Sequence, residues 1–147
     1  HLYLETKANE DNPAIKLPNG LAGAMDDYMN TFRNPSADEL IELKSLFTNT
    51  LEAVDEIWGA QAFRTEDRDQ SRSPLYDAEM IAVASILKEK EDAINLLKQN
   101  QEEIINATNE TLRTDSRFLD SITKGTNTPS KIIYRIETIS DILRTFL

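Results

Sequence analysis

The sequence predicts an all-α protein, an irregular bundle of about six helices. Apolar residues recur three and four positions apart over most of the chain, a spacing that places them on one face of a helix. Only four Gly and five Pro occur among 147 residues, a number that suits long helices separated by short turns. No segment has the alternation of a half-buried strand, and there is no internal repeat or low-complexity tract. The chain is long enough to bury a core of its own.

Two domain regions are expected, divided near residue 20. Residues 1–19 are polar and contain Pro13 and Pro18, which indicates a linker or lead-in from an upstream domain. Residues 20–147 carry the helical periodicity and form the predicted bundle. Because no initiator Met opens the chain, we expect it to begin inside a longer protein.

The first two helices are predicted between residues 20 and 58. Residues 34–39 end the first helix and begin the second, and two positions fit the beginning of the second helix equally well. Ser36 and Glu39 fit a capping box, in which each side chain satisfies a backbone N–H of the first turn, and Pro35 fits the first helical position. The second helix keeps an apolar face over about five turns, formed by Leu40, Leu43, Phe47, Leu51, Val54, Ile57 and Trp58. Gly59 is the expected stop.

The third helix is predicted to be the central one. Ser73 and Pro74 cap it, and residues 75–87 are apolar on nearly all sides, which is typical of a helix surrounded by others. A charged break at residues 88–92 follows. We expect Trp58 and Tyr76 to belong to the core rather than to a ligand site.

Three further helices are predicted after the break. The fourth has a polar, exposed middle at residues 98–103 and an apolar face of Ile94, Leu97, Ile104 or Ile105, and Leu112. The short fifth helix ends at Gly125. Thr128 caps the sixth, and Pro129 occupies its first position.

The charge of the chain disfavours nucleic-acid binding as a whole. Sixteen basic and 26 acidic residues give a net charge of −10, and phosphate backbones repel such a chain. From Arg113 onward, however, six basic residues stand against four acidic ones. An anionic partner, if one docks, is therefore expected in the last quarter of the chain.

The turn at residues 121–135 is the candidate contact within this quarter. Lys124 and Lys131 flank a Gly-Thr-Asn-Thr-Pro segment, and Arg135 follows Lys131 by four residues, on the same helix face. The segment has a complete explanation as a helix stop followed by a helix cap. The free N–H groups of a helix start also suit an anion or nucleic acid, and a protein contact is the third alternative.

Residues that carry chemistry are scarce. Cysteine is absent and the only histidine is His1, which disfavours thiol, imidazole and Ser-His-Asp chemistry. No glycine-rich phosphate loop occurs. The adjacent carboxylates fit helix starts and solvated faces better than a metal site; they are Asp26 with Asp27, Asp38 with Glu39, Glu66 with Asp67, and Glu102 with Glu103. We therefore predict no catalytic residue, no cofactor and no metal.

The sequence also bears on location and membranes. No run of about 18 apolar residues occurs, so no membrane partner is expected. The absence of cysteine is compatible with the cytoplasm, which is the predicted location.

Four segments in order resemble a large prokaryotic family. They are residues 30–47, residues 53–64 with Gly-Ala-Gln-Ala-Phe-Arg at their end, residues 72–78, and residues 122–127 with Ile-Thr-Lys-Gly-Thr-Asn, followed by Arg135. This order is similar to the helical C-terminal region of proteins that begin with a ParB-like domain, some of which add an HNH-type nuclease domain. The family includes the GmrSD restriction enzymes, which attack modified phage DNA. The resemblance covers residues 15–147.

The resemblance implies a non-catalytic accessory or scaffold domain that supports a nucleotide-dependent, DNA-cleaving ParB-like domain. The Asp-Gly-Gln-type motif and the nuclease motif belong to the other domains of the family and do not occur here. The implied partners are the upstream ParB-like domain of the same polypeptide and DNA through the longer protein. A second copy of the chain is a further candidate partner, independent of the resemblance.

The candidate anion, DNA or interdomain contacts combine this resemblance with the basic turn. They are Arg64, Arg72, Lys124, Thr126, Asn127, Lys131 and Arg135. The alternative function, from another class, is a helical protein–protein interaction or dimerisation module with no role in nucleic-acid binding.

Overall fold

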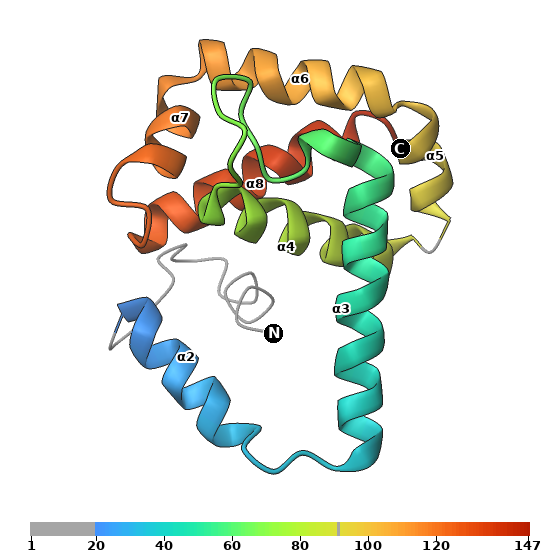
Figure 1. The fold of residues 1–147 in the computed structure, drawn as a ribbon, viewed down its shortest axis with the longest axis vertical. Coiled ribbons are helices and arrows are strands. Elements are labelled where there is room, and N and C mark those ends of the chain that lie inside the picture. Colours follow the sequence, from blue (N-terminus) through green and yellow to red (C-terminus); the bar gives the residue numbers. More distant parts are fainter. Residues whose placement is uncertain (1–19, 91) are drawn as a thin grey trace.

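The computed structural model describes residues 20–90 and 92–147, and these form an all-α fold, as predicted. The expected lead-in at residues 1–19 lies outside the described residues. The helices are α2 (Gly20–Thr31), α3 (Ala37–Trp58), α4 (Ser73–Glu89), α5 (Ala93–Gln99), α6 (Gln101–Thr114), α7 (Ser116–Thr123) and α8 (Pro129–Arg144), with a 3₁₀ turn, η1 (Gly59–Gln61), after α3. Figure 1 shows α4 and α8 side by side, with α5, α6 and α7 around them.

The predicted fourth helix is divided in two at Asn100. The Asn100 backbone (φ −107°, ψ 25°) is not helical, and the Asn100 N–H donates to the carbonyls of both Leu96 and Leu97. The Asn100 side chain donates to the Leu96 carbonyl over 2.7 Å. Gln101, the next residue, donates to the Glu56 carbonyl of α3 over 3.1 Å. The polar middle of the predicted helix is therefore a corner, held by the side-chain bonds of Asn100 and Gln101 to carbonyls of α5 and α3.

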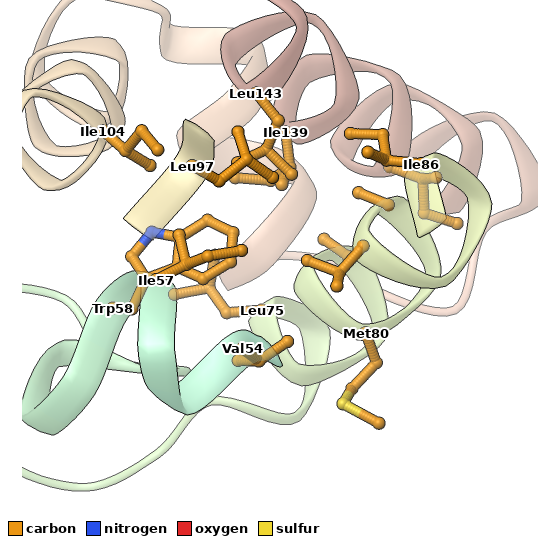
Figure 2. Packing of buried hydrophobic residues seen from close by; sticks show 14 of the residues in the cluster. Val54, Ile57, Trp58, Leu75, Met80, Ile86, Leu97, Ile104, Ile139 and Leu143 are labelled. Carbon is orange, nitrogen blue, oxygen red and sulfur yellow. The ribbon is translucent and has the colours of Figure 1, made fainter. Parts of the chain in front are cut away.

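The core lies where α4 meets α8 and the carboxyl half of α3. Leu75 and Ile86 of α4 and Ile139 and Leu143 of α8 are fully buried, and Figure 2 shows them packed together with residues of α3, α5 and α6. This confirms the central position predicted for α4. Trp58 is also in the core, as expected, and its indole N–H donates to the Thr108 hydroxyl over 3.4 Å.

Helix α3 has one apolar face but two environments. Val54, Ile57 and Trp58 at its carboxyl end are buried. The same face continues toward the amino end, where its side chains are exposed. We call these residues the α3 stripe: Leu40, Leu43, Leu46, Phe47 and Leu51. In Figure 1 this half of α3 extends away from the bundle of α4 to α8, and we call α2 together with residues 37–51 the arm.

The helix ends follow the predicted signals in part. Ser36 and Glu39 form the capping box, with the Ser36 N–H donating to Glu39 Oε2 over 2.7 Å and the Glu39 N–H to Ser36 Oγ over 3.2 Å. Gly59 ends α3 with a positive φ of 52°. The predicted Ser73 cap is wrong, because Ser73 is already helical and Arg72 occupies the cap position without a side-chain bond.

No helix within the two described ranges combines the length and apolar character needed to cross a membrane.

Candidate functional site

The turn between α7 and α8 is built from cations that bind backbone carbonyls. The Lys131 ammonium donates to the carbonyls of Lys124 (2.5 Å) and Asp120 (3.4 Å). The Arg135 guanidinium donates to the carbonyls of Ser121 (3.2 Å) and Thr126 (2.6 Å). The last carbonyls of a helix have no helical partner and carry its negative end, so cations stabilise them there. Lys131 and Arg135 therefore close α7.

Arg135 is the most buried of the candidate contacts. Only 1% of its side chain is exposed, and Nη2 lies 2.8 Å from Asp77 Oδ2 of α4. Burial lowers the pKa of the guanidinium, and Asp77 opposes that shift. The Nε group has no hydrogen-bond partner among the described residues. Arg135 thus joins α4, α7 and α8 from inside the fold instead of reaching the surface.

The remaining residues of the turn lie at or near the surface. Lys124 is exposed and pairs with Asp120 over 3.0 Å. Asn127 is exposed and Thr126 half-buried, with the Thr126 carbonyl bound to Arg135. Thr128 occupies the predicted cap position, but its hydroxyl donates to the Gly125 carbonyl (2.9 Å) and does not cap α8.

Gly125 allows the chain to reverse between α7 and α8. Its φ of +53° lies in the left-handed region, where a residue with a Cβ is strained. A Cβ would meet Thr128 Oγ1 at 3.6 Å and Lys131 Nζ at 3.8 Å, which are ordinary contacts. The requirement for glycine is therefore one of backbone conformation and not of space.

The other two candidates lie in the loop between η1 and α4. Arg72 donates to the Thr65 hydroxyl over 3.0 Å and lies 3.5 Å from Asp67, so it closes this loop. Arg64 is exposed. Among the described residues, no hydrogen bond or ion pair joins Arg64 or Arg72 to the α7–α8 turn. The structure therefore gives two separate groups in place of one basic surface.

The same loop is anchored on a buried acid that the sequence interpretation did not single out. Glu79 of α4 is 1% exposed, and its Oε2 accepts the Phe63 N–H over 2.8 Å. Phe63 has a φ of +63°, which is strained for a residue with a Cβ. Burial raises the pKa of Glu79 to about 8, against the opposing effect of the Phe63 bond. The available signal was an acidic residue inside the otherwise apolar run of α4.

Tyr76 belongs to this anchor and not to the core. Its side chain is 37% exposed, and its ring lies 4.9 Å from the ring of Phe63. The expectation of a core tyrosine was therefore wrong, because Tyr76 covers the loop from outside.

A polar cluster precedes the turn at the start of α7. Asp115 caps α7 by accepting the N–H groups of Arg117 (2.8 Å) and Phe118 (3.0 Å), and its other oxygen accepts the Tyr134 hydroxyl (2.6 Å). The bond from Tyr134 lowers the pKa of Asp115 and raises that of Tyr134. The Arg117 guanidinium lies 3.9 Å from the centre of the Tyr134 ring. These contacts fasten α7 to α8.

Adjacent carboxylates do not converge in the fold. Within residues 20–90 and 92–147, no three His, Asp or Glu side chains are grouped so that they could hold a metal ion. Glu66 instead pairs with Arg113 of α6 over 2.7 Å.

Comparison of the chain with protein-family models, with curated proteins and with solved structures gave no match.

Proposed function

We propose that this chain is a non-catalytic helical scaffold domain of a GmrSD-like restriction or phage-defence protein. It would support a nucleotide-dependent, DNA-cleaving ParB-like domain of the same polypeptide. One observation supports the scaffold role: the side chains of Lys131, Arg135 and Arg72 donate hydrogen bonds to carbonyl and hydroxyl groups of the same fold. Groups that hold helices and loops together in this way are suited to a rigid support. The family part of the proposal rests on the order of sequence segments described above.

The test compares DNA binding by this chain with that of the longer polypeptide. A fluorescent duplex is titrated with each protein over a range of salt concentrations. We expect binding by the longer polypeptide alone. A steep salt dependence for the 147-residue chain would contradict the scaffold role, because it reports Lys and Arg contacts to phosphates. If the polypeptide has no Asp-Gly-Gln-type motif before residue 1, the family assignment is wrong.

Arg64, Lys124 and Asn127 remain the exposed candidates for a contact with DNA or a neighbouring domain. Lys124→Glu tests this in the longer polypeptide, with Lys98→Glu as a control, since Lys98 is also exposed and also pairs with an acid, Glu56. Loss of DNA binding or cleavage in Lys124→Glu alone would support the contact. Equal activity in both variants would show that the turn only ends α7 and begins α8, and that Lys124 makes no such contact.

The second candidate function is a protein–protein interaction or dimerisation module without a role in DNA binding. The exposed α3 stripe favours it, because contiguous apolar surface on a folded protein often marks an interaction site. Measurement of the molar mass in solution tests dimerisation directly. A monomer at all concentrations would contradict the dimer.

A further inference from the structure

The α3 stripe is an apolar surface without a partner in the described fold. Leu40 is 54% exposed and Phe47 51%. From Leu40 to Leu51 the stripe extends over about three turns, or about 16 Å. Every member occupies the helix face that α4, α5 and α6 cover farther along, so the stripe continues the core beyond its last covering helix.

A groove extends the stripe toward the bundle. It has a volume of about 560 Å³ and lies between α3, α4 and α5. Leu46 of the stripe lines it together with Leu87 and Ile94. Glu52, Glu56 and Lys88 also line this groove. Because Glu56 already pairs with Lys98 over 3.2 Å, Glu52 is the carboxylate that the groove offers to a partner.

The segment that carries this surface is acidic. Residues 20–58 hold eight acidic and two basic residues, a net charge of −6, which is more than half of the −10 of the chain. Glu39 and Glu42 lie one turn before Leu43 and Leu46, on the same side of the helix. A partner that covers the stripe therefore meets these two carboxylates along one edge.

We propose that the α3 stripe and its groove bind a basic amphipathic helix of a partner protein. An amphipathic helix places apolar residues at i, i+3, i+4 and i+7 on one side, which matches the spacing of the stripe. Lys and Arg beside those residues would face the carboxylates, and such complementarity selects the partner and speeds association. This inference goes beyond the scaffold role and does not depend on it.

Two other occupants fit the charge less well. A second copy would bring two acidic edges together, and like charges across an interface are unfavourable. Residues 1–19 contain three acidic residues and two lysines, so they lack the excess of positive charge that the surface favours.

The test uses the 147-residue chain and three fluorescent peptides of about four turns each. The first is an amphipathic helix of Leu and Lys, the second has Glu in place of Lys, and the third is a scrambled Leu–Lys sequence. Binding is followed by fluorescence anisotropy. We expect saturable binding of the Leu–Lys helix only, and weaker binding as the salt concentration rises from about 0.05 to 0.5 M.

Variants of the chain locate the site. Leu43→Gln with Phe47→Gln should weaken binding at least about tenfold, because apolar anchors dominate such interfaces. Ile41→Gln is the matched control, since Ile41 is 66% exposed on the same helix but lies away from the stripe. Glu42→Lys with Glu52→Lys should also weaken binding, whereas the equal charge change in Asp69→Lys with Glu137→Lys should not. Far-UV circular dichroism confirms that each variant is folded.

Several results would overturn the proposal. The proposal is wrong if the chain binds the scrambled peptide as tightly as the Leu–Lys helix. It is also wrong if the Phe47→Gln and Ile41→Gln variants bind the Leu–Lys helix equally tightly. If the chain is a dimer that Phe47→Gln dissociates, the occupant is a second copy. If the peptide binds only after Ile15→Gln with Leu17→Gln, the occupant is the first segment of the chain itself. None of these results bears on DNA binding, so the scaffold proposal is tested separately.

Discussion

The two halves of α3 have the same apolar periodicity and opposite environments. Ile57 in the carboxyl half is fully buried, whereas Leu40 and Phe47 in the amino half are more than half exposed. The carboxyl half contacts α4, α5 and α6, and no helix of the bundle covers the amino half. Periodicity therefore shows which face of a helix prefers an apolar neighbour, and the tertiary fold decides whether that neighbour is present.

The largest effect expected from this comparison is on stability. Ile57→Ala should lower the free energy of unfolding by about 2–5 kcal/mol, because it removes buried methyl groups and leaves a cavity. Ile41→Ala makes the same change on the same helix at an exposed position, and it should alter stability by less than about 0.5 kcal/mol. Urea denaturation measures both. Similar losses in the two variants would show that the face of the arm that carries Ile41 is covered in solution.

The next effect concerns the buried cation of the bundle. Arg135→Met should cost about 2–3 kcal/mol, because the carbonyls of Ser121 and Thr126 lose a charged donor and Asp77 loses its partner. This cost lies at the lower end of the range for breaking a buried ion pair, because Asp77 is 42% exposed and can be hydrated. Urea denaturation of Arg135→Met, of Asp77→Asn and of the double variant gives the coupling energy between the two side chains. A coupling near zero would mean that Asp77 contributes nothing to the role of Arg135.

Glu79 predicts how the bundle responds to pH. Its folded pKa of about 8 lies above the ordinary value of 4.5, so the folded state holds a proton that the unfolded state has lost. The stabilisation that this bound proton gives the folded state is complete below pH 4.5 and is lost as the pH rises through about 8. Glu79→Gln keeps an acceptor for the Phe63 N–H and should flatten the fall in Tm over this range.

The arm supplies the control for this pH effect. Glu42→Gln makes the same substitution at an exposed site and should keep the pH profile of the wild type. If Glu79→Gln keeps that profile too, Glu79 ionises without cost in the folded state.

The smallest effect is expected at the start of the arm. Ser36→Ala removes the capping box and should weaken the first turns of α3 locally by about 1 kcal/mol. Because those turns lack tertiary cover, amide hydrogen exchange there should speed up while the urea midpoint of the bundle stays constant. Thr128→Ala is the control, since the Thr128 side chain makes no cap bond. A lower urea midpoint in Ser36→Ala would show that arm and bundle unfold together.

Features set by neighbouring residues were predictable from the sequence. The all-α class, the capping box at Ser36, the stop at Gly59 and the central position of α4 all depend on periodicity or on contacts within a few residues. Asn100 was missed because an asparagine within a polar stretch fits a helix and a corner equally well. Its use as a corner depends on α3, which is distant in sequence.

The candidate site was less predictable, because its side chains act over long sequence distances. Arg135 and Lys131 do share one helix face, but that pattern does not distinguish a surface cation from one that binds carbonyls inside the fold. The partner of Arg135 is Asp77, 58 residues away. Glu79 was equally hidden, since a lone acid in an apolar run shows only that something unusual is buried there.

The contact between α4 and α8 affects how the protein is made in the cell. Helix α4 is apolar on most sides, and α8 covers it from a position more than 50 residues later in the chain. During synthesis, the faces of α4 that contact α8 stay uncovered until residues 129–144 have left the ribosome. Such transiently exposed surface favours aggregation and recruits chaperones. Release of α8 from the ribosome is therefore the step that completes the cover of α4 and allows the bundle to fold.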